Sequence, residues 1–154
     1  MENSTMIKKD SSKVTGMVNV VIRDDAGKIK QEFTVPNLVV DTGLAFIASR
    51  MKDTTEAAMS HMAVGSDTTP AAAAQTALIA ELSGARVALT STTVTTNSIS
   101  YVATFAAGTG TGALTEAGLF NDPTTGTMLC RTVFAVINKA AADSMTVTWT
   151  ITIS

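Results

Sequence analysis

The last ten residues of the chain, Met145 to Ser154, read MTVTWTITIS. Every second residue is apolar, and the residues between them are threonines, with a serine at the end. This period of two predicts a β-strand that buries one face and exposes the other. At about 3.3 Å per residue the strand is about 33 Å long, whereas most strands have about five or six residues. A long strand without charge invites pairing with another chain, so we expect it to lie inside a sheet or to be covered at an edge.

The rest of the sequence predicts a mainly β protein with antiparallel strands. Residues 14–24 and 29–35 are β-rich runs joined by the turn sequence DDAGK, which indicates a β-hairpin. Further β-rich stretches are HMAVGS (61–66), RVALTSTTVTT (86–96), SISYVATFAAG (98–108), AGLFND (117–122) and TMLCRTVFAVIN (127–138). A turn near Asn97 joins the second and third of these. The expected fold is an antiparallel β-sandwich or a jelly-roll-like barrel.

One or two short helices are expected beside the strands. The first follows Asp41 or Thr42, either of which suits a helix cap, and its apolar residues fall at helical spacing. These apolar residues are Leu44, Ile47 and Met51, with Phe46 beside them. The second candidate is the alanine-rich stretch 71–82, which begins after Pro70.

Composition indicates a single domain, 14–154, preceded by a flexible arm, 1–13. Of the 154 residues 45% are hydrophobic and only 16% are charged, so the chain has ample material for a core and a surface poor in charge. A net charge of −2 argues against nucleic acid as a direct partner. No apolar run is long enough to span a membrane, and a single cysteine excludes an intrachain disulfide.

Residues with catalytic chemistry are few, and their pattern predicts a protein that is not an enzyme. His61 is the only histidine, and no spacing of Cys and His supports a metal site. Cys130 lies between apolar residues and is expected to be a small buried hydrophobe. The sequence GTGTGA (108–113) matches a dinucleotide-binding pattern, but no helix follows it, so a loop is expected instead. We therefore expect no cofactor, no metal and no catalytic residue.

Charged residues within the β-rich stretches raise one structural question. Arg131 shares a strand face with Leu129 and Val133, so it needs a carboxylate partner or a sheet edge. Glu116 is one candidate for that partner.

The carboxylates that a glycoside hydrolase would use are scattered along the chain, and the scarcity of aromatic residues disfavours a sugar-cleaving or sugar-binding cleft. They include Asp67, Glu81, Glu116, Asp122 and Asp143.

From about residue 37 to residue 153 the chain resembles a family of small virion proteins of tailed bacteriophages. Four stretches carry the resemblance: HMAVGSDTTPAAAAQTALIAEL, SISYVATF, LTEAGLFND, and GTMLCRTVF followed by INKAAADSMTVTWTITI. Proteins of this kind are regarded as capsid decoration (cement) proteins or as tail-fibre and collar components. The family has no catalytic residues, so the resemblance implies a structural role.

The leading functional hypothesis is a capsid decoration protein that binds the outer surface of the major capsid protein shell and bridges capsomers. A tail-fibre or collar module of the virion is the alternative. The expected partners are the major capsid protein and further copies of the chain itself, as a homodimer or homotrimer. The expected location is the capsid exterior, after assembly in the host cytoplasm. Arm residues expected to contact a partner, and to become ordered only there, are Met6, Ile7, Lys8, Lys9 and Lys13.

Overall fold

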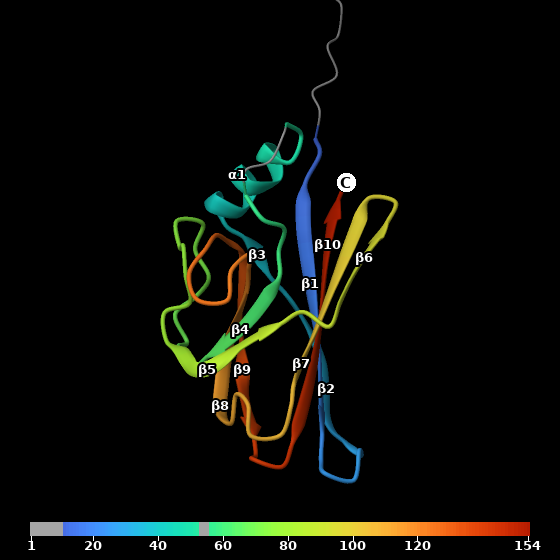
Figure 1. Ribbon diagram of the computed structural model, residues 1–154, viewed down its shortest axis with the longest axis vertical. Coiled ribbons are helices and arrows are strands. Elements are labelled where there is room, and N and C mark those ends of the chain that lie inside the picture. Colours follow the sequence, from blue (N-terminus) through green and yellow to red (C-terminus); the bar gives the residue numbers. More distant parts are fainter. Residues whose placement is uncertain (1–10, 53–55) are drawn as a thin grey trace, which may run out of the picture.

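The computed structural model describes residues 11–52 and 56–154, which form two antiparallel β-sheets of five strands each (Figure 1). Sheet A has the order β2 (Ile29–Pro36), β1 (Val14–Arg23), β10 (Ser144–Ile153), β7 (Ser98–Phe105) and β6 (Ser91–Thr95). Sheet B has the order β3 (Leu38–Val39), β9 (Met128–Lys139), β8 (Gly112–Phe120), β4 (His61–Gly65) and β5 (Glu81–Ala88). The prediction of a mainly β, sandwich-like fold is confirmed.

The closing strand, β10, lies at the centre of sheet A. It pairs antiparallel with β1 on one side and with β7 on the other. Its alternate apolar residues Met145, Val147, Trp149 and Ile151 are all buried against sheet B. Because both neighbours use its backbone hydrogen bonds, this uncharged strand offers no free edge to another chain.

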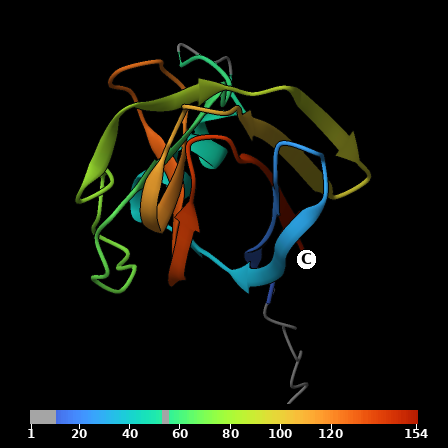
Figure 2. The same cartoon turned by 90° about the horizontal axis from the view of Figure 1, so that it is seen from below.

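The chain crosses from one sheet to the other at both edges of the sandwich. β2 and β3 are the first strands of the two sheet orders and follow each other directly, and β5 and β6 are the last strands and are also consecutive. Each of these connections therefore joins one sheet edge to the facing edge, as the end-on view in Figure 2 shows. The core is enclosed between the sheets and centres on large side chains such as Trp149, Phe105 and Leu114.

The predicted β-hairpin and the strand at 61–66 are confirmed, but the stretch 86–96 is not one strand. β5 ends at Ala88 in sheet B, and β6 begins at Ser91 in sheet A. Between them the backbone N–H of Leu89 donates to Ser60, while that of Thr90 donates to Val102. The chain therefore changes sheets within a continuous run of β-favouring residues. β8 is also longer than the predicted strand at 117–122, since it begins at Gly112.

The first predicted helix is present as α1 (Asp41–Ser49), but its predicted cap was wrong and its predicted face is only partly right, since Phe46 and Ile47 pack against the core. Val40 occupies the N-cap position, and no side chain caps the helix. Gly43 and Phe46 are its buried residues, whereas Leu44 is 45% exposed and Met51 88% exposed. Gly43 lies so close to the Leu129 carbonyl oxygen of β9 that a Cβ atom would not fit. The close approach of the helix to β9 therefore decides which face is buried.

The second predicted helix, 71–82, was wrong. In the described residues, 66–80 form an irregular segment, which we call the strap, and β5 begins at Glu81. Polar side chains of sheet B and of the strap itself bind the strap's backbone, and these contacts replace the hydrogen bonds of a helix. The alanine content favoured a helix locally, but tertiary contacts overrode that preference.

Candidate functional site

A buried ion pair between Arg131 and Glu116 joins β9 to β8, which confirms Glu116 as the partner of Arg131. Both side chains are 0% exposed. Nε and Nη2 of Arg131 donate to Oε2 of Glu116 at 3.0 and 2.8 Å. The Asp67 carboxylate lies 3.8 Å from Nη2. The cost of burying these two charged side chains is offset because each is bonded to an opposite charge and to further polar groups.

The same two side chains hold the strap against sheet B. Nη1 of Arg131 donates to the Thr69 carbonyl at 2.9 Å and to Oε1 of Gln75 at 3.1 Å. Glu116 accepts the backbone N–H groups of Ala80 at 2.8 Å and Ile79 at 3.2 Å. The ion pair therefore anchors the strap, because Arg131 and Glu116 bind its backbone and side chains as well as each other.

Glu81 and Asp143, two more of the carboxylates considered for a glycoside hydrolase, each bind a basic side chain. Glu81 binds Arg86 through two hydrogen bonds of 2.7 and 2.9 Å. Asp143 accepts hydrogen bonds from Lys30 Nζ at 2.7 Å and from the Ala140 N–H at 2.9 Å, and these hydrogen bonds lower the pKa of its carboxyl group.

Asp122 organises the turn between β8 and β9. Its Oδ1 accepts the backbone N–H groups of Thr124 and Thr125, both at 2.8 Å. These bonds, led by the one from Thr125, lower the pKa of the carboxyl group to about 2. Arg86 braces the same turn by donating to the carbonyls of Asp122 and Thr125, and its guanidinium group lies 3.8 Å from the centre of the Phe120 ring.

The Asp122 turn predicts a specific dependence of stability on pH. Because the folded pKa lies below the ordinary value of 3.8, the ionised carboxylate stabilises the folded state above about pH 4. This contribution is lost as the pH falls from about 4 to about 2. Melting temperatures measured between pH 2 and pH 6 should show that Asp122→Asn is less stable than the wild type at pH 6, with a difference that shrinks towards pH 2. A difference that stays constant across this range would contradict the assignment.

His61, Cys130 and the glycine-rich stretch are the remaining sequence features considered for catalysis or cofactor binding. His61 is partly buried, and its Nδ1 lies 2.8 Å from the Ser60 hydroxyl oxygen. Cys130 is buried, as the sequence predicted, and burial raises the pKa of its thiol well above the usual value. The glycine-rich stretch forms a loop that leads directly into β8, as predicted. Across residues 11–52 and 56–154, no cluster of three or more His, Cys, Asp or Glu residues is placed to hold a metal ion.

The outer surface of sheet A is covered by hydroxyl side chains. Because alternate residues of β10 point into the core, its threonines point outward, and the strand pairings bring further serines and threonines beside them. We call this surface the hydroxyl face. Its Ser and Thr residues are Thr15, Thr34, Ser91, Thr93, Thr95, Ser98, Ser100, Thr104, Ser144, Thr146, Thr148, Thr150 and Thr152.

The described charged residues of the hydroxyl face lie towards its two ends, with Lys13 at the end opposite the β1–β2 turn. Arg23 and Glu32 lie near the β1–β2 turn, and the rows that cross the middle of the sheet carry none. One such row runs from Asn19 through Thr148 and Val102 to Ser91. A hydroxyl group costs far less to remove from water than a charge, and threonine has few rotamers to lose. This face is therefore well suited to docking against another protein.

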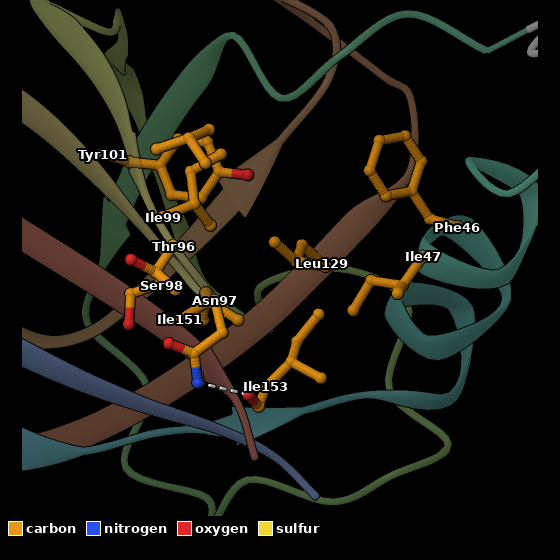
Figure 3. Close-up of a pocket in the computed structure, with 11 residues that line it drawn as sticks. Phe46, Ile47, Thr96, Asn97, Ser98, Ile99, Tyr101, Leu129, Ile151 and Ile153 are labelled. Atoms are coloured by element: carbon orange, nitrogen blue, oxygen red, sulfur yellow. Dashed lines mark hydrogen bonds between the residues drawn. The ribbon is translucent and has the colours of Figure 1, made fainter. Parts of the chain in front are cut away.

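An apolar pocket of about 190 Å³ opens between α1 and the β6–β7 turn, and we call it the mouth pocket (Figure 3). Phe46 and Ile47 of α1 lie on one side of it, with Leu129 of β9 beside them. Strands of sheet A and the β6–β7 turn line the other side with Val94, Thr96, Asn97, Ser98, Ile99, Tyr101, Ile151 and Ile153. Val94 is 69% exposed and Ile153 46% exposed, so the pocket opens to solvent.

Most of the arm residues predicted to contact a partner lie outside the described residues: Met6, Ile7, Lys8 and Lys9. Lys13 is described, and its side chain is exposed at the start of β1. Its backbone forms hydrogen bonds in both directions with Ser154, which extends the pairing of β1 with β10 by one residue. The predicted contacts of this arm stay a prediction.

Sequence reasoning missed the mouth pocket and the strap. Ile153 continues the inward alternation of β10, but the sequence does not reveal that α1 leaves a gap opposite it. The strap was missed because its many alanines indicated a helix. The one available signal was Arg131, whose place in an apolar strand required polar groups from elsewhere in the chain.

Comparisons with known proteins identify no relative of this chain. No protein-family model fits the chain, and neither a curated protein nor a solved structure matches it. The class of fold is a mainly β protein with two antiparallel sheets, and α1 is the single α-helix in the described part. None of the helical structure in residues 11–52 and 56–154 has the length and hydropathy needed to cross a bilayer.

Proposed function

We propose that this chain is a structural protein of a tailed-bacteriophage virion that decorates the capsid. It binds the outer surface of the major capsid protein shell and bridges neighbouring capsomers. The observation that carries the proposal is the hydroxyl face, a broad outward surface of sheet A with no charge across its middle rows. The order of the sequence blocks that resemble small virion proteins supports the same role.

The physical argument is that a decoration protein needs a rigid surface that loses water at little cost. Charges are depleted in the centre of protein interfaces because their desolvation is expensive. β10 is held on both sides by β-strands, and its inward residues are buried in the core, so the threonines between them keep fixed positions. Little conformational entropy is then lost when the face is covered.

The number of copies in purified virions tests the proposed function. Quantitative mass spectrometry against the major capsid protein should give a copy number comparable to that of the shell protein. Only a few copies per particle would instead support a tail-fibre or collar module. Absence from the virions would contradict both roles.

A charge placed in the middle of the hydroxyl face should weaken capsid binding. We expect Thr148→Lys to reduce the affinity for decoration-free shells by at least about tenfold, because the ammonium group has to lose water in the interface. Asn138→Lys, at an exposed position of β9 in sheet B, serves as the control and should bind like the wild type. Co-sedimentation of each purified protein with the shells measures the effect. Equal binding of both variants would show that the hydroxyl face is not the docking surface.

A further inference from the structure

The mouth pocket is part of a longer apolar trough. A neighbouring hollow of about 210 Å³ shares Phe46, Ile47, Ile99 and Tyr101 with it. Val94 and Ile153 stand at the pocket with about half or more of their surface exposed. An opening lined in this way leaves apolar surface in water, which favours burial by an apolar segment of another chain.

The N-terminal end of the described chain begins beside this pocket. Val14 is paired with Ile153, a pocket residue, and Lys13 is hydrogen-bonded to Ser154. Ten residues precede Ser11, with the sequence MENSTMIKKD. Met6 and Ile7 are the only adjacent apolar residues among them, and polar residues flank the pair on both sides. Ile7 is four residues from Ser11, a distance of about 13 Å in an extended chain.

We propose that the mouth pocket receives Met6 and Ile7 of a second copy of this chain, and that the exchange is reciprocal. In a two-fold dimer each copy then gives one segment and accepts one, so both pockets are filled. Lys8 and Lys9 follow the apolar pair and remain at the solvent-facing rim. The proposal concerns self-association and holds whether or not the protein decorates a capsid.

The exit direction of the chain favours a second copy over the chain's own segment. The backbone hydrogen bonds between Lys13 and Ser154 continue the pairing of the two strands one residue beyond the end of β10. Residues 11–13 therefore continue in the direction of β1 at the end of the sandwich (Figure 1). To reach its own pocket, Ile7 requires a reversal of the chain between Lys8 and Ser12, whereas a facing copy needs none.

Disulfide trapping tests the contact directly in the full-length protein. Ile7→Cys combined with Val94→Cys should form a disulfide under mild oxidation, and a mixture of ¹⁴N- and ¹⁵N-labelled protein should place it between different chains. Ile7→Cys with Val136→Cys is the control, because Val136 is exposed at 52% but does not line the pocket. A bond within one chain would assign the pocket to the chain's own segment and overturn the proposal. So would the absence of a bond between positions 7 and 94.

The oligomeric state provides a second measurement. Light scattering coupled to size exclusion should show a dimer for the wild type, and Ile7→Asp should raise its dissociation constant at least about tenfold. Ser4→Asp adds the same charge to the same segment outside the apolar pair and should leave the dimer intact. Circular dichroism verifies that each variant is folded. A monomeric wild type at 100-micromolar concentration, or equal weakening by both substitutions, would overturn the proposal.

Discussion

Replacing Arg131 with methionine is expected to lower the free energy of unfolding by about 3–5 kcal/mol, the usual cost of removing one partner from a buried ion pair. Glu116 is 0% exposed and would lose the guanidinium group that is hydrogen-bonded to its carboxylate. The strap would also lose the two bonds from Nη1 to Thr69 and Gln75. For a protein of this size the melting temperature should fall by about 10 °C.

Hydrogen exchange separates this effect from a general loss of packing. The backbone N–H groups of Ile79 and Ala80 donate to Glu116, so their exchange should accelerate more than that of the central strand β10. The double variant Arg131→Met with Glu116→Gln removes both charges and should recover part of the lost stability. If the double variant is less stable than either single variant, and the exchange of the strap is unchanged, the ion pair is not the anchor of the strap.

Replacing Trp149 with alanine is expected to destabilise the fold by about 3–5 kcal/mol, because it leaves a large cavity in the core. Trp149 is 0% exposed, lies on the central strand and is paired with Val18 and Tyr101 on the two neighbouring strands. Urea denaturation followed by circular dichroism measures the loss. Fluorescence is unsuitable for this variant because Trp149 is the only tryptophan in the chain.

A phenylalanine at the same position should be tolerated much better. Nε1 of Trp149 is buried and has no hydrogen-bond partner among the described residues. Trp149→Phe removes this donor and retains most of the apolar volume, so the cost should be about 1.5 kcal/mol or less. Thr148→Ala, which changes the outward neighbour, should cost less than Trp149→Ala. If the alanine and phenylalanine variants are equally unstable, the indole N–H has a partner that stabilises the fold.

The sequence alone determined the class of fold and the inner and outer faces of several strands. The alternation of residues 145–154 predicted which side chains of β10 are buried, because a strand with one face against a core must keep apolar residues at every second position. The same rule identified the hairpin of β1 and β2. It also showed that Arg131 requires a polar partner, since a buried charge without one is too costly to persist.

Only the tertiary structure decided where the chain leaves one sheet for the other. Residues 86–96 are β-favouring throughout, so no local signal marks the change of sheet at Leu89 and Thr90. At this point the backbone N–H of Leu89 binds Ser60, next to sheet B, and that of Thr90 binds Val102 in sheet A. Local preference also indicated a helix at 71–82, but Arg131 binds Gln75 and Glu116 binds Ala80, and the region is part of the irregular strap. The hydroxyl face and the mouth pocket likewise depend on neighbours distant in sequence. The residues of the hydroxyl face and of the mouth pocket are brought together by strand register and by the placement of α1. Packing across the whole core sets that register and placement, and no short stretch of sequence encodes it.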